Sequence, residues 1–160
     1  MSKLADKIQE SYKQLSDKKA TEKATPGTTC KVLTKTKDLL DADDHKQYRS
    51  VVGKLMYYCQ KIAPEMANAV RELAAHMDAP CREHIAKLGR TVGFVKKVRD
   101  IPLTFRKPFK LRAISQTDSN YAADSSERKS ISGHLHTIGG MVTNWLSHKQ
   151  KIVTMSITET

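Results

Sequence analysis

The sequence predicts an α+β fold in which helices come first and antiparallel strands follow. Two observations carry this prediction. Up to Asp100, apolar side chains recur every three or four positions, which is the period of an amphipathic helix. After Pro102 the period changes to about two, which is the period of a strand. A chain of 160 residues is long enough for one domain or two small ones.

Residues 1–47 are expected to form a polar lead-in. Apolar residues at helical spacing predict a short helix over 2–15. Residues 16–36 are rich in Lys, Thr and Ser and contain Pro26-Gly27, which predicts a loop or extended linker. An acidic cluster follows and suits the positive end of the next helix dipole. Its members are Asp38, Asp41, Asp43 and Asp44.

Residues 48–100 are expected to form a helical module. Seven apolar residues between Tyr48 and Ile62 fall on one face of a helix. Pro64 suits the first position of a second helix, and Pro80 is expected to end it. A third helix is expected over 82–98.

Residues 101–160 are expected to form a small antiparallel sheet. Gly139-Gly140 is a hairpin signal between two alternating segments. Ser156–Glu159 matches the S-x-x-E capping box that begins a helix. Strands are expected at 103–105, 109–115, 131–138 and 141–146.

The positive charge is concentrated in the middle of the chain. Residues 48–114 carry fourteen Lys/Arg and five Asp/Glu, whereas residues 1–47 carry ten and eight and residues 115–160 carry four of each. A localised basic field of this kind indicates a polyanionic partner, most often nucleic acid. The alternative is a solvated basic surface without a partner.

The third predicted helix shows the basic pattern best. Between Lys87 and Arg112 there are nine basic residues and one acid, Asp100. Phe94 lies among them and would either stack on a base or pack on a neighbouring element; packing is the expectation. Gly89 and Gly93 lie four apart, which would let another backbone approach closely. The residues expected to contact phosphates are Lys87, Arg90, Lys96, Lys97 and Arg99.

The sequence offers few other candidates for catalytic or metal-binding residues. Asp118 follows a predicted strand and is either a catalytic metal ligand or an ordinary turn residue. His134 and His136 are two apart on a strand, so they should share a face; a surface role is expected, because no third ligand lies nearby. The three cysteines form no CxxC pair and are expected to be reduced.

The sequence favours an intracellular protein, cytoplasmic or nuclear, without a membrane partner. Its apolar runs fall short of the roughly 20 residues that cross a bilayer. The charged start lacks the apolar core of a signal peptide.

The motifs also carry a resemblance to a known family. The chain resembles the part of a copia-type (pseudoviral) LTR-retrotransposon Pol polyprotein that spans the end of the reverse transcriptase and the start of its ribonuclease H. The matching segments, which recur in the family's order and spacing, are Tyr48–Tyr58, Asn68–Ala74, Asp118–Ala122, Arg128–Gly133, Gly139-Gly140, Trp145, Lys149-Gln150 and Ser156–Glu159.

The resemblance implies a helical thumb/connection module over 48–100 and a truncated ribonuclease H-like domain over 101–160. It implies family activities of RNA-directed DNA synthesis and cleavage of RNA–DNA hybrids, with Mg²⁺ as cofactor and Asp118 as the first metal-binding carboxylate. The polymerase's paired aspartates and the other ribonuclease H carboxylates are absent from this chain. We therefore expect no catalysis by this chain alone, because two-metal chemistry needs several ligands.

Two alternatives stay open. In one, the chain is a non-enzymatic module that binds nucleic-acid backbones, such as that of an RNA–DNA hybrid, together with the remaining Pol segments where these are expressed. Otherwise it is a non-functional reading frame whose strands lack partners.

Overall fold

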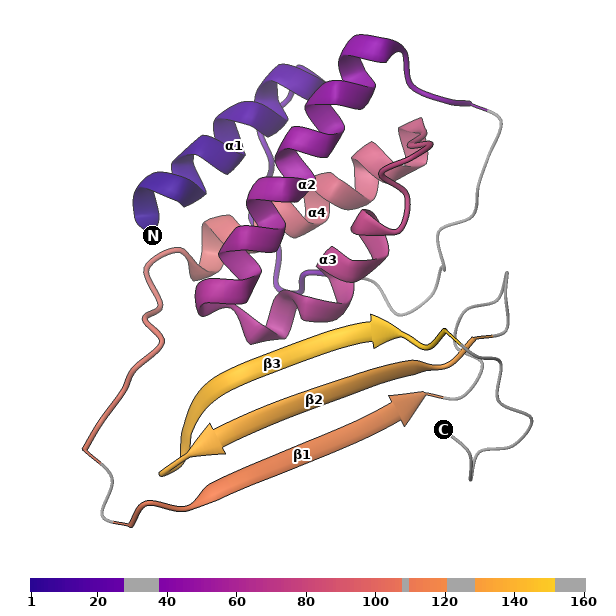
Figure 1. The fold of residues 1–160 in the computed structure, drawn as a ribbon. Helices are drawn as coiled ribbons and strands as arrows, with labels where there is room; N and C mark the ends of the chain where they lie inside the picture. Colours follow the sequence, from indigo (N-terminus) through magenta and orange to yellow (C-terminus); the bar gives the residue numbers. More distant parts are fainter. Residues whose placement is uncertain (28–37, 108–109, 121–128, 152–160) are drawn as a thin grey trace. The chain divides into compact units, whose positions relative to one another are not determined.

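The computed structural model describes residues 1–27, 38–107, 110–120 and 129–151. The chain divides into two compact units, Met1–Pro102 and Leu103–Thr160, which we call the helical unit and the sheet unit. Within these described residues, four α-helices precede three antiparallel strands, which confirms the predicted α+β class (Figure 1).

The first helix is α1, which spans Ser2–Ser16 as the periodicity predicts. Its apolar face is buried in the core of the helical unit, against α2 and α4. Asp17 ends the helix in the left-handed region at φ 53°. The buried residues of α1 are Ala5, Ile8, Tyr12 and Leu15.

The second helix, α2, spans Ala42–Ile62 and begins earlier than predicted. Asp41 caps it, because its carboxylate accepts a hydrogen bond of 2.9 Å from the backbone N–H of Asp44. Asp43 and Asp44 lie in the first turn. The acidic cluster was expected to precede the helix, but most of it builds the cap and first turn, where negative charge is stabilising.

The next elements are a 3₁₀ turn, η1 (Pro64–Met66), and two helices, α3 (Ala67–Ala74) and α4 (Arg82–Val98). The bounds of α4 match the prediction, and Pro64 does begin its element. The prediction that Pro80 ends the preceding helix is wrong, because α3 ends at Ala74. After Ala74 the backbone hydrogen bonds are of the 3₁₀ type. The N–H of His76 donates to the carbonyl of Leu73, and the N–H of Met77 donates to the carbonyl of Ala74.

Two tyrosines of α2 differ in the hydrogen bonding of their hydroxyl groups. The hydroxyl of Tyr48 donates a 3.0 Å hydrogen bond to the backbone carbonyl of Leu73. The hydroxyl of Tyr58 is buried and has no hydrogen-bond partner among the described residues. Burial raises the pKa of both phenols, so both stay neutral at ordinary pH.

Replacing each tyrosine with phenylalanine should therefore change stability in different directions. Tyr48→Phe removes one hydrogen bond to the Leu73 carbonyl, which keeps its bond from the His76 N–H, and should lower the free energy of unfolding by about 1 kcal/mol. Tyr58→Phe removes an unsatisfied buried hydroxyl and should leave stability unchanged or raise it. Urea unfolding followed by the helical circular-dichroism signal measures both; a larger loss for Tyr58→Phe would contradict the assignment.

A buried histidine lies at the start of α4. His84 is fully buried, and its Nδ1 accepts a 2.9 Å hydrogen bond from the backbone N–H of Cys81. Its ring stacks on His76 with 4.3 Å between centroids. Burial, with a smaller contribution from His76, lowers the pKa of His84 to about 4. The ring is therefore neutral at pH 7.

Two of the three cysteines, Cys59 and Cys81, are buried in the helical unit, and the thiol of Cys59 donates a 3.4 Å hydrogen bond to the carbonyl of Ala63. Cys30 lies outside the described residues.

The sheet unit contains β1 (Ala113–Asn120), β2 (Ile131–Ile138) and β3 (Met141–Lys149), ordered β1-β2-β3 with both pairs antiparallel. Gly139 and Gly140 form the predicted hairpin turn, with φ of 59° and 81°. Such positive φ values favour glycine.

The strand bounds differ from the prediction at three places. The expected strand at 103–105 is absent, since residues 101–107 carry no strand pairing. β3 runs beyond Leu146 to Lys149, because its pairing with β2 continues to Ile131. β1 begins at Ala113 and runs past Ser115 to Asn120, because it pairs with β2 along that whole length. Phe109 and the capping box at Ser156–Glu159 lie outside the described residues.

Candidate nucleic-acid interface

The five basic residues expected to contact phosphates divide into two groups along α4. Lys96 and Lys97 lie in its last turn and are exposed. Arg99 follows the helix and is engaged within the chain: its Nη1 lies 2.7 Å from Asp6 Oδ1, and its Nε lies 3.4 Å from Asp100 Oδ1. The first group, at the far end of the helix, therefore offers two exposed ammonium groups.

Lys87 and Arg90 form the second group and are half-buried. Lys87 Nζ lies 4.0 Å from Glu72 Oε2. The guanidinium of Arg90 donates to the carbonyl of Gly27 at 3.1 Å and to the hydroxyl of Thr25 at 2.7 Å. These two side chains therefore hold neighbouring segments as well as contributing positive charge.

The segment that Arg90 contacts is the region predicted as a linker. We call residues 18–27 the strap, because they cross α4 in extended form. The backbone N–H of Lys23 donates to the carbonyl of Gly93 at 3.3 Å, and the hydroxyl of Thr91 donates to the carbonyl of Pro26 at 3.0 Å. The strap is thus fixed to α4 through backbone atoms.

The two glycines of α4 explain this close approach. A Cβ added at Gly93 would overlap the backbone carbonyl of Thr21, and one added at Gly89 would overlap the hydroxyl of Tyr12. The spacing of the glycines predicted that another backbone would come close; the strap does so at Gly93, whereas Gly89 meets a side chain of α1. Phe94 is buried, which confirms that it packs inside the unit.

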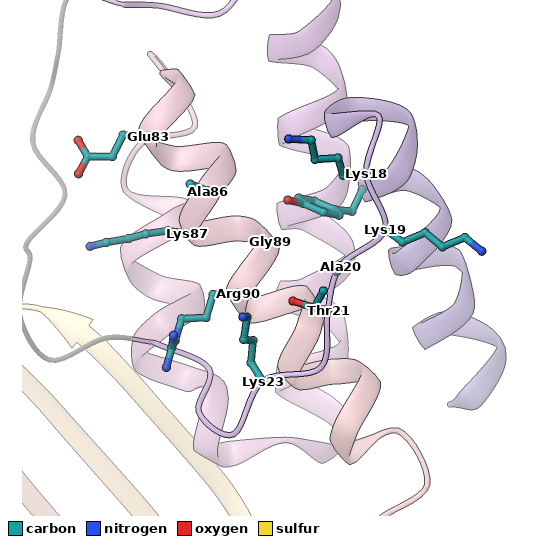
Figure 2. A pocket seen from close by; sticks show the side chains of 11 residues that line it. Lys18, Lys19, Ala20, Thr21, Lys23, Glu83, Ala86, Lys87, Gly89 and Arg90 are labelled. Carbon is teal, nitrogen blue, oxygen red and sulfur yellow. The ribbon is translucent and has the colours of Figure 1, made fainter.

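A groove of about 760 Å³ lies between the strap and the first half of α4. Figure 2 shows Lys87 and Arg90 projecting from the helix and Lys18 and Lys23 carried by the strap. Sequence reasoning missed the strap lysines, because the region up to residue 47 is nearly neutral overall. The groove is lined by Tyr12, Lys18, Lys19, Ala20, Thr21, Lys23, Glu83, Ala86, Lys87, Gly89 and Arg90.

Asp118 lies within β1 rather than at a strand end, which corrects the predicted position. It is exposed, and it pairs with Gly133 of β2, which in turn pairs with Ser147 of β3. Across the described ranges, no three His, Cys, Asp or Glu side chains gather where they could hold a metal ion. The described donors around Asp118 therefore do not make a two-metal site.

His134 and His136 share a face of β2, as their spacing predicts. Their rings are tilted at 54°, with 5.1 Å between centroids. Both are half-buried in the sheet unit.

Comparison with known proteins places the chain in a family. It is 31% identical over 112 residues to "Secreted RxLR effector protein 161" of Plasmopara viticola, which covers 70% of this chain and 79% of that protein. It is also 31% identical over 112 residues to the "Retrovirus-related Pol polyprotein from transposon TNT 1-94" of Nicotiana tabacum. A third relative, at 30% over 117 residues, is the "Uncharacterized mitochondrial protein AtMg00810" of Arabidopsis thaliana.

The chain has an α+β fold and belongs to the same family as the effector, and it is also similar to a retrotransposon Pol polyprotein. The matched region spans 8% of the transposon polyprotein and 48% of the mitochondrial protein, so it corresponds to a part of each. No protein-family model and no solved structure matches the chain. Among the described helices, none combines the length and apolar character needed to cross a bilayer.

Proposed function

We propose that the chain corresponds to the reverse transcriptase thumb/connection and the start of ribonuclease H in a copia-type Pol polyprotein. Three observations support this assignment: the ordered motifs from Tyr48 to Gln150, the similarity to a transposon Pol polyprotein, and the succession of a helical unit and an antiparallel sheet. The remaining Pol segments would be its partners.

We further propose that this chain alone does not cleave RNA–DNA hybrids. Two-metal hydrolysis clamps the attacking and leaving oxygens between ions held by several carboxylates. Asp118 is the only acidic side chain in the described part of the sheet unit. Tight Mg²⁺ binding would need ligands from outside the described residues.

Hybrid cleavage by the purified chain tests this proposal. In the presence of Mg²⁺, wild type and Asp118→Asn should both give the background rate of a protein-free control. Mg²⁺-dependent cleavage by wild type that disappears in Asp118→Asn would show that the site is complete.

The function that the geometry supports best is binding of a nucleic-acid backbone by the helical unit. The observation that carries it is the excess of positive charge in residues 48–102 of this unit, ten Lys/Arg against five Asp/Glu, which continues onto the strap. Phosphate contacts from Lys and Arg supply affinity without sequence readout. Lys96 and Lys97 are the exposed pair on α4 that such a backbone can reach.

The salt dependence of binding to an RNA–DNA hybrid tests this function. Affinity should fall linearly with salt on logarithmic axes, because each phosphate contact releases counterions. Lys96→Gln/Lys97→Gln should make the slope shallower by roughly 1 to 2, since each duplex phosphate contributes about 0.9. The matched control is Lys3→Gln/Lys7→Gln, which removes the same charge from exposed positions of α1. A slope near zero for wild type would exclude phosphate contacts.

One observation favours the second candidate, a non-functional reading frame. Large apolar side chains of the sheet unit are exposed, with Leu111 at 83% and Leu146 at 47%. An open sheet with apolar surface is prone to aggregate. Broad, uncooperative loss of Trp145 fluorescence on heating would support this candidate, whereas a sharp transition would show that the sheet unit is folded and would contradict it.

A further inference from the structure

The groove between the strap and α4 gathers positive charge from two segments that are distant in sequence. Lys18 and Lys23 come from the strap, and Lys87 and Arg90 come from α4. Glu83 is the one acidic residue in the lining. In Figure 2 the side chain of Lys19 points away from α4 and that of Lys87 points away from the strap, with its Nζ 4.0 Å from Glu72 Oε2, so we assign neither a phosphate contact in the groove. The field within the groove therefore favours an anion.

The strap engages only part of the Arg90 side chain. A guanidinium carries five N–H donors in a planar fork, and the strap takes two of them through Gly27 and Thr25. These two bonds fix the orientation of the fork beside the groove. A fork held in this way is suited to phosphate, which it can bind through paired N–H groups.

The dimensions of the groove select a thin ligand. Its volume of about 760 Å³ is that of a ligand pocket, for which ~300–1,000 Å³ is typical. One wall is an extended segment and the other is a helix face, so an extended chain fits between them (Figure 2). A duplex, whose major groove alone is about 12 Å wide, would contact only the rim.

The uncharged lining suits sugars better than bases. Ala20, Ala86 and Gly89 present small apolar surfaces. The ring of Tyr12 is buried and does not offer a stacking platform, although stacking is what gives affinity for bases. Contacts should therefore be to the backbone and should not distinguish base sequence.

We propose that this groove binds the sugar–phosphate backbone of a single-stranded nucleic acid. The proposal rests on the nucleic-acid binding proposed above. It places that binding in the groove and specifies a single-stranded ligand. Phosphates lie between Lys18 and Lys23 of the strap and Arg90 of α4, and the like charges on the two walls are neutralised when the strand binds.

The test compares two charge-matched variants of the full chain. Lys18→Gln/Lys23→Gln removes two ammonium groups from the groove and keeps the aliphatic stems; Lys3→Gln/Lys7→Gln removes two from exposed positions of α1. Affinities for a single-stranded oligonucleotide, a duplex and polyglutamate are measured at several salt concentrations. Helical circular dichroism and urea unfolding establish that each variant is folded.

Wild type should bind the single strand more tightly than the duplex or polyglutamate. The groove variant should bind it more weakly, with a salt slope shallower by about 1.4, since each single-strand phosphate contributes about 0.7. The α1 variant should keep the wild-type slope.

Equal losses in the two variants, a preference for duplex, or equal affinity for polyglutamate would overturn the groove assignment. If Lys96→Gln/Lys97→Gln weakens binding and the groove variant does not, nucleic-acid binding stands and the groove assignment fails. Absence of binding to either oligonucleotide overturns both.

Discussion

Acidification from about pH 7 to about pH 4.5 is expected to lower the free energy of unfolding of the helical unit by about 2 kcal/mol through His84 alone. Burial lowers the pKa of this ring from 6.5 to about 4. Between these values the unfolded chain binds a proton that the folded chain does not. The stability is therefore complete above about pH 6.5 and is lost as the pH falls towards 4.

The measurement is urea unfolding at a series of pH values, followed by the helical circular-dichroism signal. His84→Gln should make the dependence on pH shallower in this window, because glutamine does not titrate and can still accept the Cys81 N–H bond. His134→Gln, in β2 of the sheet unit, is the matched control for replacing one histidine by glutamine outside the helical unit. An unchanged dependence in His84→Gln would contradict the lowered pKa.

Gly93→Ala is expected to destabilise the helical unit by about 1–2 kcal/mol, although alanine is the better helix former by about 1 kcal/mol. The added methyl group meets the carbonyl of Thr21, which is backbone and cannot rotate aside. The strap must shift, and the hydrogen bond from Lys23 to Gly93 is weakened.

Gly53→Ala is the matched control within the same unit. Gly53 lies in α2, and a Cβ added there meets no atom within 4 Å. This substitution should raise the free energy of unfolding by about 0.5–1 kcal/mol through helix propensity alone. Urea unfolding measures both variants. If Gly93→Ala were as stable as Gly53→Ala, the close contact between the strap and α4 would be excluded.

The helices were predictable because each carries its own apolar period. α4 is the clearest case, since its bounds follow from the sequence. The end of α3 was not predictable from Pro80, because three-residue backbone bonds after Ala74 end the helix earlier. The early start of α2 required knowing that Asp41 is a cap, and any residue of the acidic cluster was a possible cap.

The groove shows why the candidate site was only partly predictable. Lys87 and Arg90 were found from the local excess of charge. Lys18 and Lys23 were missed because their region is rich in turn-forming residues and its net charge is small. Only tertiary contacts across more than 60 residues, such as that between Arg90 and Gly27, place them beside α4. Gly89 and Gly93 were the one local signal of that approach.

Because α1 and the strap pack against α2 and α4, a shortened recombinant piece of the helical unit must include them. Residues 48–100, which carry family motifs, do not bury all of their own apolar side chains. Ile8 is completely buried against them, and Tyr12 lies over Gly89. A recombinant piece that starts at Tyr48 would expose those apolar faces of α2 and α4 to water and should be recovered as insoluble aggregate. A piece that spans Met1–Pro102 keeps α1 and the strap and should stay soluble.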